Sequence, residues 1–196
     1  MHRRFSYFAL FGLIALLTIT ACGQNAATKD WKTFAIEEEP QIDIQFRLPP
    51  EWLVDYTPTQ GAPGQWDVAL VPPKCSADQE TEYDDNCVTL TIYLKGESDF
   101  DPNEFTSFTS QDITLNQSGS QKTIFLGEDS FDVDGLTIQR YKHLFFIGEE
   151  DDLMTFLYFE TEGAYYAFIT EMPYGEQEGE MAEQFSLLIN SIEVID

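Results

Sequence analysis

The chain has 196 residues, which is enough for one domain with a hydrophobic core. It carries 35 Asp and Glu against 10 Lys and Arg, for a formal net charge of −25 at pH 7. An excess of this sign repels nucleic acid and anionic lipid headgroups, so the sequence excludes nucleic acid as an expected partner. A basic protein partner, a bound cation and simple solubility remain as explanations of the acidity.

The first 21 residues have the pattern of a secretory signal. A basic start with Arg3 and Arg4 is followed by an apolar run over 7–19, which has no charge and is too short to span a bilayer comfortably. The residues that close it, Ile19-Thr20-Ala21-Cys22, resemble the lipobox of bacterial lipoproteins. That resemblance implies cleavage before Cys22, a diacylglyceryl group on its thiol and membrane attachment through this lipid anchor. The alternative is an ordinary secreted protein with a chance cysteine at this place.

The residue after Cys22 bears on where such a protein resides. Asp at this position is the usual inner-membrane retention signal in many bacteria that have an outer membrane, and Gly23 stands there instead. The resemblance therefore implies residence in the cell envelope, on the outer membrane facing the periplasm if the host is Gram-negative.

Residues 22–40 are predicted to form a lipidated tether. The segment is polar, rich in small residues, and ends in three glutamates before Pro40, as is typical of a solvated spacer. Trp31, Phe34 and Ile36 are candidates for a local contact with the domain, which is predicted over 41–196.

Two cysteines remain after Cys22. Outside the cytoplasm Cys75 and Cys87 are most simply explained as a disulfide, which closes an acidic loop with little apolar content. A zinc pair is disfavoured because the spacing is not CxxC and His143 is the only histidine after the signal. No metal site and no cofactor are predicted.

Alternating apolar residues predict most of the sheet. Three strands are expected over 42–48, 66–70 and 88–94, and Asp101-Pro102 has the pattern of a helix start. From 123 onward the pattern predicts a meander. Its strands are expected from 124, over 136–147, 153–160 and 164–171, followed by a helix over 176–190 and a short strand over 192–195.

The strands over 153–160 and 164–171 differ from the earlier ones because both of their faces are apolar. Met154 and Phe156 point one way, while Leu153 and Leu157 point the other. Strands of this kind are buried on both sides, so this part of the sheet is predicted to be central and covered on both faces.

Few motifs indicate chemistry. The segment 130–135 is similar to the start of a calcium loop, but Tyr141 stands where a bidentate acid is needed, and the segment fits a hairpin with an Asp-Gly turn better. A second candidate is the acidic run Glu149, Glu150, Asp151 and Asp152, expected at a loop tip. It is a possible protein-binding site, although charged turns are usually only solvated. His143 lies in an apolar strand with no nucleophile motif nearby, so the protein is predicted not to be an enzyme.

The ordered part, 41–196, resembles proteins of the PsbP and Mog type, including the DcrB-like bacterial lipoproteins. The resemblance is in an opening strand that runs into Phe46-Arg47-Leu48-Pro49-Pro50-Glu51-Trp52, and in a final helix that contains Phe185-Ser186-Leu187-Leu188-Ile189-Asn190. Glu51 departs from the glycine that commonly precedes this tryptophan, and the loop between Cys75 and Cys87 is an addition. The resemblance implies an α+β fold, an antiparallel sheet flanked by helices, and a non-enzymatic role.

Two functions follow as the main hypotheses, and an unrecognised hydrolase, which could use a pair of the many carboxylates, is a third and minority one. The first is an envelope-anchored lipoprotein with an accessory or protein-binding role, which meets an envelope protein partner through its acidic surface. The alternative is a lipoprotein that binds a small ligand or a divalent cation in a pocket over the aromatic-rich sheet. A concave pocket with convergent polar groups would favour the alternative.

Overall fold

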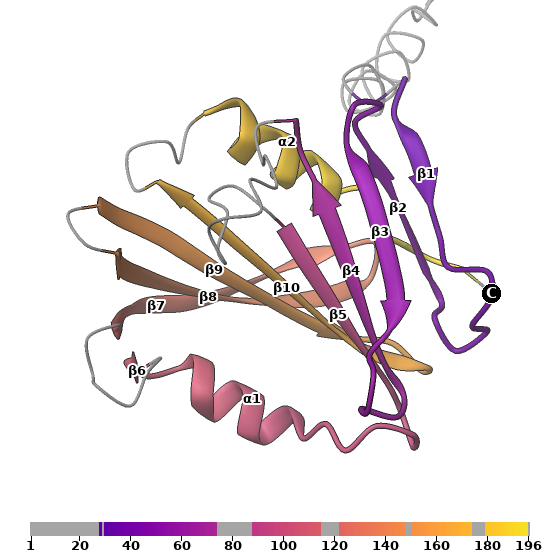
Figure 1. The fold of residues 1–196 in the computed structure, drawn as a ribbon, viewed down its shortest axis with the longest axis horizontal. Coiled ribbons are helices and arrows are strands. Elements are labelled where there is room, and N and C mark those ends of the chain that lie inside the picture. Colours follow the sequence, from indigo (N-terminus) through magenta and orange to yellow (C-terminus); the bar gives the residue numbers. More distant parts are fainter. Residues whose placement is uncertain are drawn as a thin grey trace, which may run out of the picture.

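The computed structural model describes residues 28, 30–73, 88–114, 122–147, 150–173 and 179–195. These residues form two antiparallel sheets and two helices (Figure 1). The larger sheet has eight strands in the order β3-β4-β5-β10-β9-β8-β7-β6, and the smaller has three in the order β1-β2-β11. The predicted α+β class, an antiparallel sheet flanked by helices, is confirmed.

The strands and helices follow the expected pattern with a few additions. In chain order the elements are β1 (Lys32–Phe34), β2 (Ile44–Leu48), β3 (Leu53–Pro58), β4 (Gln65–Val71), β5 (Val88–Leu94), α1 (Pro102–Thr109), β6 (Ile113–Thr114), β7 (Lys122–Val133), β8 (Leu136–Ile147), β9 (Glu150–Glu160), β10 (Ala164–Pro173), α2 (Glu180–Ile189) and β11 (Glu193–Val194). No helix in these described ranges is long and apolar enough to cross a membrane.

Helix α1 begins as its sequence predicts. The Asp101 carboxylate accepts a hydrogen bond of 2.8 Å from the backbone N–H of Asn103, and Pro102 occupies the first turn. The β7–β8 hairpin turns at Asp134-Gly135, both of which have positive φ, as the Asp-Gly dipeptide favours. This confirms the hairpin over the calcium-loop interpretation of 130–135.

The large sheet is covered on both faces, as expected for its central strands. On one face α1 packs through Phe105 against a cluster that includes Tyr158. On the other face lie α2 and the small sheet (Figure 1). They contribute Phe185 and Phe46 to the main core, where both rings contact Phe168 of β10. The sheet is thus the middle layer of the domain.

The expected tether is partly wrong, because its second half belongs to the fold. Strand β1 pairs with β2, so that Phe34 lies opposite Phe46, and Ile36 is buried in the main core. In the sequence, Phe34 and Ile36 next to three glutamates do not form a pattern that predicts a strand. In the structure, pairing with β2 is enough to hold this short strand at the edge of the small sheet. The domain therefore begins about ten residues before position 41.

Three features of the strands go beyond the sequence prediction. Strand β3 was not predicted, because it is an edge strand whose residues are mostly exposed and show little alternation. Ile124 and Leu126 open β7 but remain exposed. The last strand, β11, joins the small sheet by pairing with β2, not the large one.

Candidate functional site: a pocket beneath the second helix

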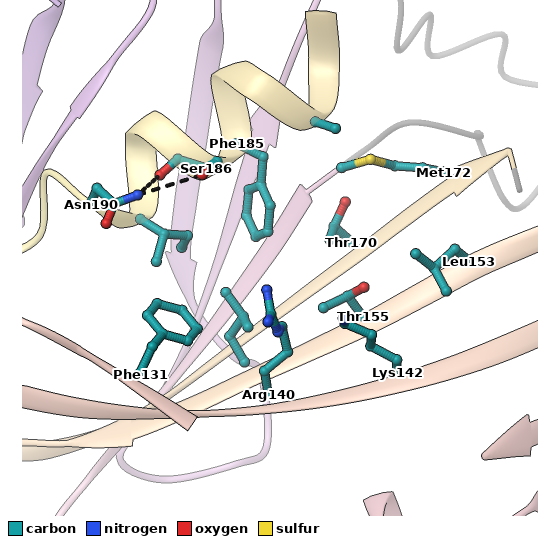
Figure 2. A pocket seen from close by; sticks show the side chains of 13 residues that line it. Phe131, Arg140, Lys142, Leu153, Thr155, Thr170, Met172, Phe185, Ser186 and Asn190 are labelled. Carbon is teal, nitrogen blue, oxygen red and sulfur yellow. Dashed lines mark hydrogen bonds between the residues drawn. The ribbon is translucent and has the colours of Figure 1, made fainter. Parts of the chain in front are cut away.

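A cavity of about 540 Å³ lies between α2 and one face of strands β7 to β10 (Figure 2). Its volume falls within the range of about 300–1,000 Å³ that is usual for small-molecule sites. The floor is formed by Phe131, Arg140, Lys142, Leu153, Thr155, Leu157, Thr170 and Met172, and the roof by Ala182, Phe185, Ser186, Ile189 and Asn190.

The roof is held in place by the apolar stripe of α2. Phe185, Leu188 and Ile189 are buried in the main core, as the spacing of these residues predicts. The helix is also tied to the turn after β2, because the indole N–H of Trp52 donates a hydrogen bond of 3.0 Å to the Gln184 side chain. The α2 side of the cavity is therefore fixed at more than one point.

A polar row crosses the floor of the pocket. Lys142 of β8 pairs directly with Thr155 of β9, which in turn pairs with Thr170 of β10. Directly paired residues of antiparallel strands point to the same face, with Cβ atoms about 4.5–5.5 Å apart. One lysine and two threonine side chains thus start from adjacent positions on this face, under the helix (Figure 2).

Thr170 is the unusual member of this row. Its side chain is only 2% exposed, and its hydroxyl has no hydrogen-bond partner among the described residues. Buried polar atoms without a partner are rare, and each costs about 1–3 kcal/mol. Figure 2 shows this hydroxyl directed into the space below the helix. The pocket therefore contains a buried donor that a ligand could satisfy.

Of the two cationic side chains of the pocket, Arg140 is held in an ion pair, whereas Lys142 is in none of the ion pairs among the described residues. The Arg140 guanidinium binds the Asp129 carboxylate through two hydrogen bonds, Nε to Oδ1 at 2.7 Å and Nη2 to Oδ2 at 2.6 Å. This hydrogen bonding raises the pKa of Arg140 and lowers the pKa of Asp129. The ion pairs in the described part of the chain hold Arg140 to Asp129 and Lys95 to Glu160, and neither involves Lys142.

Apolar rows lie on both sides of the polar one. Along β9 and β10, the pair on one side of Thr155 and Thr170 is Leu157 with Phe168, and the pair on the other side is Leu153 with Met172. The Phe185 ring reaches down from α2 toward the same space (Figure 2). The pocket therefore combines apolar walls with a few polar groups in one line, the usual composition of a ligand site.

The site residues predicted from sequence lie elsewhere. Cys22, Cys75, Cys87 and Glu149 are outside the described residues, so the lipid anchor and the disulfide stay predictions. Glu150 and Asp151 begin β9. Asp152 lies within that strand, opposite Phe145 of β8 and Pro173 of β10, and is only 4% exposed. It is therefore not at an exposed loop tip, whereas the protein-binding role of this acidic run remains untested.

His143 is a core residue, as its apolar strand indicated. Its Nε2–H donates to the carbonyl oxygen of Thr109 at 2.7 Å, so the neutral Nδ1 accepts from the Thr123 hydroxyl at 3.0 Å. Burial lowers the pKa of His143. The ring joins the end of α1 to the large sheet. No group of three or more His, Cys, Asp or Glu that could hold a metal occurs among the residues that the structure describes.

The pocket residues were not singled out from sequence, although one signal was present. Thr155 and Thr170 have apolar neighbours at i−2 and i+2, on the same face of their strands, and Lys142 is the only lysine in its strand. A polar residue on a face predicted to be buried indicates either a hydrogen bond or a ligand. Only the register of three strands shows that these positions are adjacent.

Comparison with known proteins places the fold. No protein-family model matches the chain, and no curated protein does. Among solved structures, cyanobacterial PsbP (CyanoP) from Synechocystis sp. PCC 6803 matches with a TM-score of 0.51 and 13% identity, over 84% of this chain and 92% of that one. The chain has a PsbP-like fold.

Two further solved structures match less closely. LpqN, involved in cell envelope biogenesis of Mycobacterium tuberculosis, has a TM-score of 0.49 at 10% identity, over 87% of this chain and 95% of that one. A protein from Bacteroides thetaiotaomicron has a TM-score of 0.45 at 11% identity, over 84% of this chain and 48% of that one. Identities this low are informative about the fold alone.

Proposed function

We propose that this protein is a non-enzymatic, envelope-anchored accessory lipoprotein that binds a small ligand in the pocket beneath α2. The observation that carries this proposal is the polar row on the pocket floor, in which the buried Thr170 hydroxyl lacks a partner among the described residues. A site used only for packing gains nothing from such a hydroxyl, because valine fills the same volume without the desolvation cost.

The envelope location depends on Cys22 and can be tested separately from the pocket. Metabolic labelling with radiolabelled palmitate should mark the wild-type chain and not Cys22→Ser. The variant should also leave the membrane fraction or stay held by an uncleaved signal. It lacks the thiol that would carry the diacylglyceryl group, and stable anchoring needs more than one acyl chain. Absence of label on the wild type would rule out the anchor while leaving the pocket untouched.

Binding in the pocket is tested with N-phenyl-1-naphthylamine, an uncharged apolar dye whose fluorescence rises out of water. The wild-type protein should bind it saturably. Ala182→Trp places a large ring in the roof and should abolish most of this signal, because Ala182 lines the cavity. Thr155→Phe fills the same space from the floor of the pocket. It replaces Ala182→Trp in this test if that variant does not fold.

The matched control is Ser107→Trp, which puts the same ring on the exposed surface of α1, across the sheet from the pocket. It should bind the dye as the wild type does. Circular dichroism melting of all variants shows whether each is folded. Equal dye binding by the wild type and the folded pocket-filling variants would overturn the pocket as the binding site.

A further inference from the structure

We infer that the ligand of this pocket is an amphiphile with a singly charged anionic headgroup, which binds at Lys142, Thr155 and Thr170 with its apolar part against the surrounding walls. This inference rests on the proposed function, because it names the ligand class for the same site. It follows from the charge, the hydrogen-bonding capacity and the apolar surface of the pocket.

The charge of the pocket is opposite to that of the whole molecule. The chain has 35 acidic residues against 10 basic ones, yet the described lining of this cavity includes Arg140 and Lys142 and no acid. Arg140 is already neutralised by Asp129 in a two-bonded pair. Lys142 is half-buried and takes part in neither ion pair of the described residues, although its charge also helps to lower the pKa of Asp129. Its ammonium is therefore the group that favours an anion.

The hydroxyls fit the same headgroup. A carboxylate or phosphate oxygen accepts hydrogen bonds, and the polar row offers the Lys142 ammonium and two hydroxyl donors on adjacent strands. The Thr170 hydroxyl is buried and without a partner among the described residues, so a bond to a charged acceptor would offset its desolvation. A cationic headgroup would instead meet an ammonium group with no acid in the described lining.

The apolar walls require the rest of the ligand to be apolar. Leu153 and Met172 lie on one side of the polar row, and Leu157 and Phe185 border the space on the other side. A small hydrophilic anion would leave these side chains in contact with water. Burying them under an acyl chain or similar group contributes about 25 cal/mol for each Å² of apolar surface removed from water.

The headgroup is expected to carry one charge because the protein as a whole repels anions. Long-range repulsion from the acidic surface is screened beyond about 8–10 Å at physiological salt, whereas the contact with Lys142 is short and partly buried. Each further negative charge would gain no second unpaired cation in the described pocket but would add to the repulsion. A single anion on an apolar chain balances these effects.

The test is displacement of the dye by a series of twelve-carbon amphiphiles below their micelle concentrations. Dodecanoate and lauroyl-lysophosphatidylglycerol carry one negative charge, dodecan-1-ol carries none, and dodecyltrimethylammonium is a cation. The anions should bind about tenfold more tightly than the alcohol, which corresponds to one charge-assisted hydrogen-bonded contact. The cation should bind most weakly. The tighter of the two anions identifies a free fatty acid or a lipid headgroup as the source.

Two variants with controls locate the headgroup. Lys142→Gln should remove most of the preference for dodecanoate over dodecan-1-ol, whereas Lys122→Gln, an exposed lysine of β7, should not. Thr170→Val should weaken dodecanoate about fivefold without lowering the melting temperature, because the lost hydroxyl has no partner among the described residues. Thr89→Val, at an exposed position of β5, should leave binding unchanged.

The outcomes distinguish a failure of this inference from a failure of the proposed function. If dye binding depends on the pocket but the alcohol and the anions displace it equally, the anionic headgroup is wrong and the binding pocket stands. An unchanged preference in a folded Lys142→Gln variant also overturns the inference. If pocket-filling substitutions leave dye binding unchanged, the proposed function itself fails.

Discussion

The indole N–H of Trp52 donates a hydrogen bond to the Gln184 side chain across 3.0 Å, which links the turn after β2 to α2 over 132 positions of sequence. The Trp52 side chain is 2% exposed, so its N–H has little access to water. This bond fixes the helix that forms the roof of the pocket. It also gives a structural role to the tryptophan of the segment 46–52, on which the resemblance to PsbP-type proteins was based.

The first prediction concerns this bond. Gln184→Met keeps the length of the side chain but removes the acceptor, and should lower the free energy of unfolding by about 1–3 kcal/mol because a buried donor is left unpaired. Urea unfolding measures the loss. Glu183→Gln, an exposed change on the same helix, is the control and should be nearly neutral. Equal stability of Gln184→Met and wild type would show that the bond contributes nothing.

Much of the fold could be predicted because its signal is local. The 12-residue hairpin strands β7 and β8, the turn at Asp134-Gly135 and the start of α1 at Pro102 each depend on residues close together in the chain. Strands apolar on both faces correctly indicated a central position between two covering layers. The edge strands β1, β3 and β6 were not predicted, since exposed strands are stabilised by backbone pairing and show little alternation.

The pocket could not be predicted for a different physical reason. Lys142, Thr155 and Thr170 are separated by 13 and 15 positions, and they are adjacent only because three strands pair in one register. A shift of one residue would turn any of them to the opposite face. The acidic run at 149–152 was conspicuous in sequence, but Asp152 lies buried in a strand.

The second prediction is a pH dependence of stability from His143, the only histidine after the predicted signal. Burial lowers its pKa in the folded state, although the bond to the Thr109 carbonyl opposes this effect. The unfolded chain therefore binds more protons as the pH falls below the ordinary value of about 6.5, and stability must decrease. Above that pH both states are neutral and the contribution is constant.

Urea unfolding at pH 7.5 and 5.5 measures this effect above the range in which most carboxylates titrate. The wild type should lose more stability between the two values than His143→Gln, although the variant is less stable at both because it disrupts the bonds to Thr109 and Thr123. Parallel behaviour of the two proteins would contradict the neutral buried imidazole.

The third prediction concerns Gly163 in the turn between β9 and β10. A Cβ atom at this position would overlap the backbone carbonyl oxygen of Gln41 and lie 3.0 Å from its carbonyl carbon. The turn is also bound to Asp43, whose carboxylate accepts hydrogen bonds from the Thr161 hydroxyl and, at 3.4 Å, from the backbone N–H of Gly163. Gly163→Ala should thus push the small sheet away from the large one and lower stability by about 1–3 kcal/mol.

Gly61→Ala is the comparison for this substitution. Gly61 has a φ of +83° but open space around the added Cβ, so only backbone strain of about 1–2 kcal/mol opposes the change. If steric overlap with Gln41 matters, Gly163→Ala should also perturb the residues of β2 in hydrogen exchange, whereas Gly61→Ala should not. Protection of β2 that is unchanged in Gly163→Ala would contradict the close packing of the two sheets.

The last prediction returns to the disulfide expected between Cys75 and Cys87. The segment that contains them connects β4 to β5, and Leu70 pairs with Val88 where these strands meet it. Because the sheet already holds the two ends of the loop together, Cys75→Ser should lower the melting temperature without unfolding the domain. Closing a loop of this length contributes roughly 3 kcal/mol in the chain-entropy account.

Thiol labelling of unreduced, denatured protein from the envelope should find neither cysteine reactive. Labelling of both would exclude the bridge, and the stability of the hairpin would then be carried by its core residues Val68, Leu70, Leu90 and Ile92 alone.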